Sequence, residues 1–136
     1  MYMEVGFMLY VKQSSSSATA LTQNNNFKTQ TIKETLPGGA IMYVKLYKFG
    51  RIVYVKFEAT GVVSNKTHKL YNVCPFEFVP IDDIFVSAFQ RTAGNNYQSF
   101  YGGVVYEIQA DGNIMINCEN TDYLERYACT SYISKY

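Results

Sequence analysis

Residues 52–60 alternate between apolar and polar side chains more strictly than any other part of the sequence. The apolar set is Val53, Val55, Phe57 and Ala59, and the intervening side chains are Tyr54, Lys56 and Glu58. Because successive side chains of a β-strand point to opposite faces, the pattern predicts a strand with one packed face and one partly wet face. Residues 41–47 form a second expected strand, and the turn sequence 48–51 joins the two as a hairpin.

Short strand-like segments separated by turn signals continue to the end of the sequence. They are expected at residues 84–89, 100–109, 114–118 and 126–134. Asp111-Gly112 is the strongest hairpin signal, whereas Pro75 favours an edge strand or an irregular segment at residues 73–79. No helical periodicity persists. We therefore predict an all-β fold, an antiparallel β-sandwich of jelly-roll type with about 7–8 strands.

The sequence before residue 36 divides into two segments. Residues 1–12 alternate and predict an N-terminal strand. Residues 13–35 contain a run of four serines and a run of three asparagines, which predicts a linker or extended arm. Residues 36–136 are the expected β-sandwich head domain, which opens with a Pro-Gly-Gly turn signal.

The charge balance excludes several classes of partner. Twelve Lys and Arg face eleven Asp and Glu, so the net charge is +1. A general nucleic-acid binder or a polybasic membrane-surface protein usually has a clear basic surplus. No apolar run reaches the ~18 residues of a membrane-spanning helix. We therefore expect neither nucleic-acid binding nor membrane insertion.

Residues that could carry catalysis or bind a metal are sparse. His68, the single histidine, lies in the polar segment 61–72 and is expected to be a solvated loop residue, so a site of several histidines is excluded. Asp82-Asp83 follows Pro80 and predicts a turn, and Asp111 is explained by its hairpin. No nucleophile or phosphate-loop motif is present. The prediction is a chain without catalytic residues, metal or cofactor, and so not an enzyme.

The cysteines are three in number and lack metal-ligand spacing. They are Cys74, Cys118 and Cys129. We expect buried thiols that behave as small apolar side chains, with one disulfide between two of them left open.

The aromatic content is unusual, with thirteen Tyr, nine Phe and no Trp. Amide and tyrosine side chains together can hydrogen-bond to a saccharide and stack on it. Such side chains surround the Gly94 loop, and the candidate ligand-binding residues are Asn95, Asn96, Tyr97 and Tyr101. The alternative interpretation places Phe100 and Tyr101 in the core or in a subunit interface.

Several motifs, in order, give the chain a resemblance to a known family. They are the hairpin sequence 43–60, Phe78-Val79-Pro80, the late hairpin 103–116 and the closing sequence Cys129-Thr130-Ser131-Tyr132-Ile133. Together they resemble the C-terminal head domains of bacteriophage tail-fibre and baseplate receptor-binding proteins over residues 36–136. Ile81-Asp82 stands where that family usually has Arg-Pro.

The resemblance implies a β-sandwich head that forms a homotrimer and binds host cell-surface saccharide. It further implies a place in the virion, at a tail tip or fibre assembled in the bacterial host cytoplasm, with other tail or baseplate proteins as partners. No binding residue of the family is carried over, because those sites lie in variable loops. Two alternatives remain open: a purely structural virion subunit (baseplate, fibre tip or capsid decoration) and a polysaccharide depolymerase.

Overall fold

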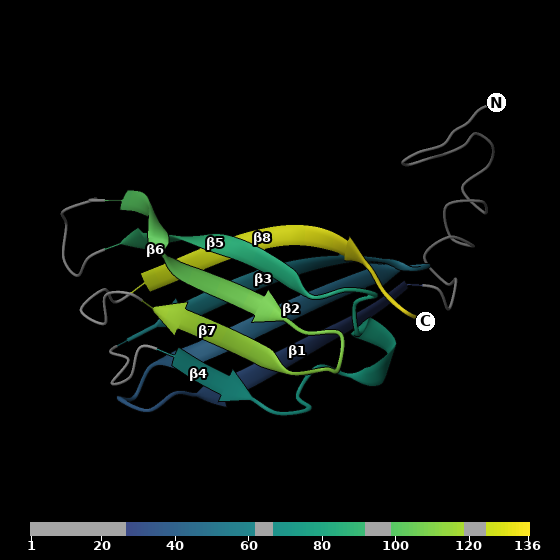
Figure 1. Ribbon diagram of the computed structural model, residues 1–136, viewed down its shortest axis with the longest axis horizontal. Coiled ribbons are helices and arrows are strands. Elements are labelled where there is room, and N and C mark those ends of the chain that lie inside the picture. Colours follow the sequence, from purple (N-terminus) through teal and green to yellow (C-terminus); the bar gives the residue numbers. More distant parts are fainter. Residues whose placement is uncertain (1–26, 62–66, 92–98, 119–124) are drawn as a thin grey trace, which may run out of the picture.

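The computed structural model describes residues 27–61, 67–91, 99–118 and 125–136. These residues form eight strands and one short 3₁₀ helix (Figure 1). The elements are β1 (Phe27–Thr35), β2 (Ile41–Phe49), β3 (Ile52–Thr60), β4 (Thr67–Leu70), η1 (Phe76–Phe78), β5 (Ile84–Arg91), β6 (Ser99–Ile108), β7 (Ile114–Cys118) and β8 (Glu125–Ile133). No helix of the described part is long and apolar enough to cross a membrane.

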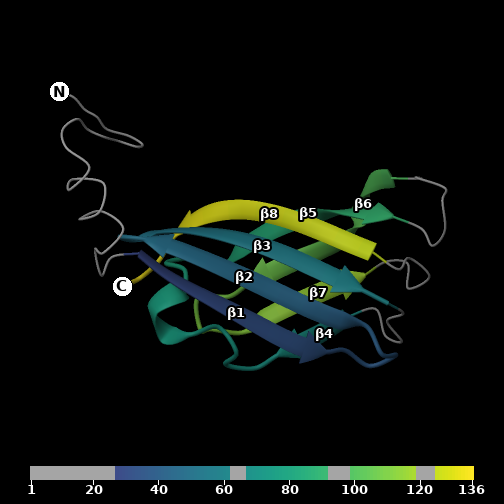
Figure 2. The ribbon, with the colours of Figure 1, turned by 180° about the vertical axis from the view of Figure 1, so that it is seen from behind.

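The eight strands form one sheet in the order β1-β2-β3-β8-β5-β6-β7-β4, with every neighbouring pair antiparallel. The sheet curls into a half-barrel, so that β1, β2, β3 and β8 form one layer and β5, β6, β7 and β4 form the other (Figures 1 and 2). The predicted all-β antiparallel fold is confirmed. Its two layers are halves of a single sheet, joined where β8 pairs with β5.

The core fills the space between the two layers. Each strand contributes alternate side chains, and those with no exposed surface include Val44, Leu46, Val53, Val55, Phe57, Val104, Tyr106, Ile108, Ile114 and Ile116. Phe57 and Tyr106 stack across the layers, with ring centroids 4.5 Å apart. The Tyr106 hydroxyl donates a hydrogen bond to the Arg126 carbonyl oxygen at 3.0 Å. The buried hydroxyl of Tyr106 therefore has a hydrogen-bond partner.

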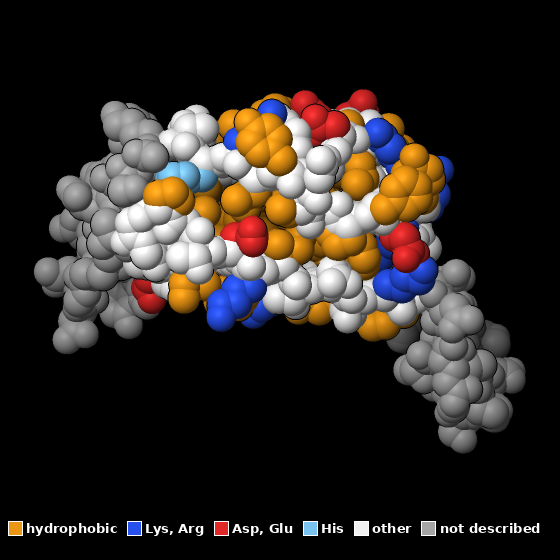
Figure 3. Space-filling view, turned by 90° about the horizontal axis from the view of Figure 1, so that it is seen from below, with side chains coloured by type: hydrophobic (Ala, Val, Ile, Leu, Met, Phe, Trp, Pro, Cys, Tyr) orange, Lys and Arg blue, Asp and Glu red, His pale blue; other side chains and the backbone are white. Residues whose placement is uncertain are grey.

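The half-barrel is open between its two edge strands, β1 and β4. Figure 3 looks toward this side and shows hydrophobic side chains along it. Ile32 of β1 and Leu70 of β4 are partly buried and pack against the core. The inner face of β1 is otherwise polar, which is a common way of protecting an edge strand.

A buried lysine holds one end of the half-barrel together. Lys48 lies on the inner face of β2 and is only 5% exposed. Its ammonium group donates to the backbone carbonyl oxygens of Glu77 and Tyr136. Nearby, the Tyr132 hydroxyl donates to the Phe78 carbonyl oxygen at 2.6 Å. These bonds fasten the η1 segment and the last residues of the chain to the sheet. Desolvation by burial lowers the pKa of Lys48.

The late hairpin has the geometry that its sequence predicts. Gly112 has a φ of 94°, a conformation that side-chain-bearing residues rarely adopt. The Asp111 carboxylate accepts hydrogen bonds from the backbone N–H and the side-chain amide of Asn113, at 3.1 and 2.8 Å. Ile108 pairs with Ile114 across the turn. The Asp111 carboxylate thus stabilises the turn.

Three expectations about the polar segments are wrong. Residues 27–35, assigned to the linker, form β1 and pair with β2 along their whole length. Thr67–Leu70, assigned to a loop, forms β4 and pairs with β7. His68 is consequently buried and not solvated, because its partner Ile116 faces the core. Both strands lie at sheet edges, where polar sequences are tolerated. Residues 1–12 and 13–26 lie outside the described part.

Candidate functional site

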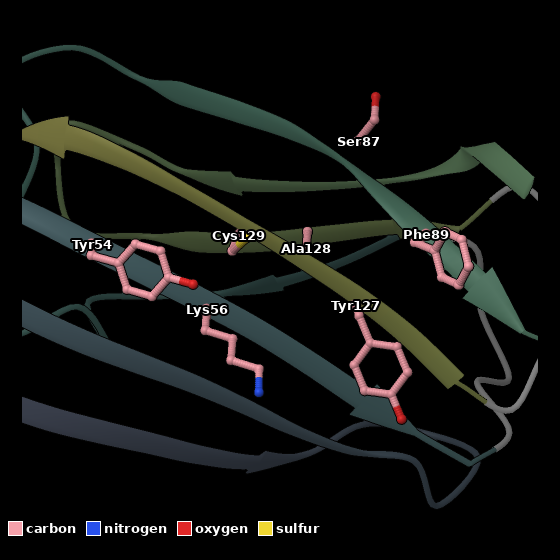
Figure 4. A pocket seen from close by; sticks show the side chains of 7 residues that line it. All are labelled: Tyr54, Lys56, Ser87, Phe89, Tyr127, Ala128 and Cys129. Atoms are coloured by element: carbon pink, nitrogen blue, oxygen red, sulfur yellow. The ribbon is translucent and has the colours of Figure 1, made fainter.

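A groove lies on the outer surface, where the two layers of the sheet separate. β5 pairs with β8 only over Phe89–Arg91, opposite residues 125–127. The preceding residues of β5 leave β8 and pair with β6 alone, with an irregularity in register between Ser87 and Phe89. This divergence opens a groove of about 340 Å³ (Figure 4). Its lining comes from three strands and consists of Tyr54, Lys56, Ser87, Phe89, Tyr127, Ala128 and Cys129.

The register of the strands explains why these side chains meet. Lys56 of β3 lies directly opposite Cys129 of β8, and Tyr127 of β8 lies directly opposite Phe89 of β5. Residues directly opposite in an antiparallel pair point to the same face of the sheet. Outward-facing side chains of three strands that are distant in the sequence therefore lie side by side, held in place by the hydrogen-bonded backbone.

The aromatic side chains extend from the groove onto the neighbouring strands. Tyr47 of β2 lies beside Tyr54, with ring centroids 6.0 Å apart. Further along the same face of β2, the Nζ atoms of Lys33 and Lys45 each lie 5.8 Å from the centroid of the Tyr43 ring. The outer surface beside the groove thus combines exposed tyrosines with amines.

One carboxylate partly neutralises the amines. Glu58 Oε2 lies 3.3 Å from the Nζ atoms of both Lys45 and Lys56. Partial burial of Glu58 opposes its ionisation, but the two ammonium groups outweigh this effect and hold the pKa of the carboxyl below its usual value. Within the groove, a side-chain hydrogen bond with Cys129 raises the pKa of Tyr54.

The groove combines apolar faces with groups that can form hydrogen bonds. Its seven lining residues supply aromatic faces, an amine, a hydroxyl and a thiol, and they include neither a carboxylate nor an imidazole. Aromatic faces stack on apolar surfaces, and the polar groups can fix the orientation of a ligand. Because the side chains stand on paired strands, their spacing is set by the sheet.

The predicted ligand-binding residues fall mostly outside the described part of the chain. This is the case for Asn95, Asn96 and Tyr97. Tyr101 lies in β6, and its backbone pairs with Phe89, a residue of the groove. The loop and the groove are therefore connected through one pair of strands, but ligand binding by these four residues stays a prediction.

Sequence reasoning missed the groove itself. The strict alternation of residues 52–60 places Tyr54 and Lys56 on the outer face, so these two positions could be predicted from the sequence. The presence of Tyr127 and Phe89 in the groove could not be predicted, because it depends on the pairing of β8 with both β3 and β5. Such long-range pairing leaves no local trace in a sequence.

The other polar residues singled out by the sequence do not gather into a site. Asp83 accepts a hydrogen bond from the backbone N–H of Ala110 at 2.7 Å, a structural contact between two turns. His68 Nε2 is buried and has no hydrogen-bond partner. Within the described ranges, no three His, Cys, Asp or Glu residues lie close enough together to hold a metal ion.

The three cysteines are free thiols in different surroundings. Cys74 and Cys118 are buried as expected, and desolvation raises the pKa of both thiols, that of Cys74 to about 12. The prediction is wrong for Cys129, which is exposed. Its place on the outer face of β8 follows from alternation with the buried Tyr132 and Arg126.

Comparison with known proteins adds no assignment. No protein-family model matches the sequence, and no curated protein is significantly similar to it.

Proposed function

We propose that the chain is a non-catalytic binding domain of a bacteriophage tail fibre or baseplate, and that it attaches to saccharide on the surface of the bacterial host. The groove between β3, β8 and β5 is the observation that carries the ligand-binding part of this proposal. The phage part rests on the ordered motifs of the sequence. A homotrimer located in the virion, with tail or baseplate proteins as neighbours, belongs to the same proposal.

The positions of those motifs in the fold support the proposal. The hairpin motif 43–60 spans β2 and β3, and the late motif 103–116 spans the β6–β7 hairpin. The closing motif 129–133 is the second half of β8, beside β3. These three motifs thus coincide with pairings that build the half-barrel, as expected if the resemblance reflects a shared architecture.

The physical basis of saccharide binding is the combination of side chains in the groove. The apolar face of a sugar ring can stack on Tyr54, Tyr127 or Phe89, while Lys56 and Ser87 donate hydrogen bonds to its hydroxyls. A shallow site of this size is expected to bind one sugar weakly, with a Kd of about 1 mM, equivalent to about −4 kcal/mol. Several copies in one particle would raise the strength of attachment through avidity.

The proposal is tested with purified protein on immobilised bacterial cell-surface polysaccharides, displayed both singly and multivalently. The double variant Tyr54→Ala/Tyr127→Ala removes both stacking faces and should weaken binding at least ~5-fold, since each stacked aromatic contributes about 0.5–1.5 kcal/mol. The matched control is Tyr71→Ala, because Tyr71 is an exposed tyrosine outside the groove. Equal binding by wild type and double variant, or no binding by the multivalent wild type, would refute saccharide binding in the groove.

A purely structural role in the virion is the second candidate. The observation in its favour is the edge strand β1, nine residues long, whose only partner in the described sheet is β2. Such an edge can accept a strand from a neighbouring subunit. Particles assembled with the Tyr54→Ala/Tyr127→Ala variant separate the two candidates. Normal assembly with lost adsorption supports the binding function, whereas normal assembly and normal adsorption support the structural one.

A further inference from the structure

Large apolar side chains exposed to solvent gather at one end of the half-barrel. The set that we call the apolar end consists of Phe27, Phe49, Ile52, Ile81 and Ile133, with exposed fractions between 43% and 58%. Four of them lie where β1 and β3 begin and where β2 and β8 end, and Ile81 lies between η1 and β5. This is the end of the molecule that carries the C-terminus (Figure 1).

The apolar end is one continuous row across four strands. Phe27 pairs with Phe49, which pairs with Ile52, which pairs with Ile133. The backbone N–H of Ile81 donates to the Ile133 carbonyl oxygen at 3.0 Å and thereby extends the row. Because adjacent strands are about 4.8 Å apart, the four paired residues span about 14 Å.

The rest of the same outer face has a different character. The next rows along the four strands carry tyrosine, threonine, lysine and glutamate side chains, such as Thr29, Tyr47, Lys56 and Glu58. Scattered exposed apolar residues are ordinary, but a contiguous row indicates a surface that is covered by something.

We propose that the N-terminal segment of the same chain, residues 1–12, packs on the apolar end. The chain enters the described fold at Phe27, which is itself the first residue of the row, and fourteen residues separate Phe27 from this segment. Its own sequence alternates, with Val5, Phe7, Leu9 and Val11 on one face. An extended segment with this pattern presents a continuous apolar face that requires a partner surface.

The dimensions of the two surfaces agree. Residues 5–11 in an extended conformation span about 20 Å, at about 3.3 Å per residue. The row spans about 14 Å over its four paired strands, and Ile81 lengthens it by about one strand spacing, to about 19 Å. The polar residues 13–26 form the connection, and a flexible chain of this length has an end-to-end distance of about 21 Å. The segment can thus fold back across the row without strain.

The test is a proximity measurement by NMR on the full chain. The variant Phe7→Cys/Cys129→Ser places one reactive thiol in the N-terminal segment, since Cys74 and Cys118 are buried. A nitroxide spin label on residue 7 should broaden the amide signals of Phe49, Ile52 and Ile133 relative to a diamagnetic label. Signals at the opposite end of the same strands, such as that of Thr60, should be unaffected.

The outcomes distinguish the occupants. Broadening that is independent of protein concentration supports the proposal. Absence of broadening at Phe49 and Ile133 overturns it. A further experiment mixes ¹⁵N protein that carries no spin label with spin-labelled ¹⁴N protein. Broadening in this mixture also overturns the proposal, because the segment then comes from a second copy.

A second variant tests the proposal without a spin label, which could itself disturb the packing of the segment. Replacing Val5, Phe7 and Leu9 together by serine should release the segment while leaving the described sheet intact. The expected result is at least a twofold increase in the fluorescence of an apolar dye such as ANS, with unchanged far-ultraviolet circular dichroism. Unchanged dye fluorescence would contradict the proposal. The matched control replaces Ser14, Ser15 and Ser16 by threonine and should leave dye binding unchanged.

Discussion

The substitution Lys48→Met tests how the η1 segment and the last residues are held against the sheet. Methionine keeps most of the aliphatic stem but removes the ammonium group, which donates to the carbonyl oxygens of Glu77 and Tyr136. Both acceptors would then lose their charged donor at a site where residue 48 is only 5% exposed. The perturbation therefore removes hydrogen bonds without opening a large cavity.

The expected loss of stability follows from two opposing contributions. Hydrogen bonds to a charged group are worth about 1.5–3 kcal/mol each. Against them stands the cost of burying the ammonium group, which is also what lowers the pKa of Lys48. We expect a net destabilisation of about 2–3 kcal/mol, equivalent to a decrease in Tm of about 8–12 °C for a domain of this size.

The matched control is Lys28→Met. Lys28 lies directly opposite Lys48 in the register and contacts the side chain of the same Glu77, but this ion pair is exposed, with 45% and 51% of the two side chains accessible. Exposed ion pairs contribute about 0–1 kcal/mol. Urea unfolding followed by circular dichroism gives both free energies of unfolding. A Lys48→Met variant no less stable than Lys28→Met would refute the reasoning.

Three further predictions concern the thiols, the pH dependence and the buried histidine. In the native protein, iodoacetamide should label Cys129 alone, and three thiols should react after unfolding; mass spectrometry that finds Cys74 labelled in native protein would contradict the assigned burial. Burial raises the pKa of Tyr106 and of Cys118, and that of Cys74 to about 12 from 9.0. These groups ionise first in the unfolded chain, so their contribution to stability should be constant below about pH 8. It should fall above about pH 9 for the two thiols and above about pH 10 for Tyr106, by up to about 1.4 kcal/mol per pH unit for each group. Urea titrations should show a shallower fall for Cys74→Ala. His68→Leu removes a buried nitrogen without a partner and should raise the free energy of unfolding by about 1 kcal/mol, and a clear loss of stability would show that the imidazole has a favourable role.

Local signals in the sequence determined the strands that combine regular alternation with clear turns. The strand at residues 52–60 and the return strand at 114–118 are found where their patterns place them. In both cases the burial of alternate side chains and the neighbouring turn act within a few residues, so the sequence contains the whole argument. The antiparallel β-fold followed from the spacing of such segments.

Only the tertiary structure decided that the two polar segments form strands. β1 and β4 have few large apolar side chains, and they become strands because β2 and β7 offer them free backbone hydrogen-bonding groups. The same pairing buries His68, which a local reading places in solvent. The energy that orders these residues comes from partners on other strands, which lie 6–22 residues away for β1 and 44–50 residues away for β4, as in Thr67 with Asn117.

The groove shows the same division. Alternation within β3 determined that Tyr54 and Lys56 face outward. Their meeting with Tyr127 and Phe89 depends on how β8 bridges the two layers and on where β5 leaves β8. The sequence by itself thus determined which side chains are available on each strand. The pairing of distant strands decided which of them share a surface, because the register of a sheet is set by contacts that no single segment contains.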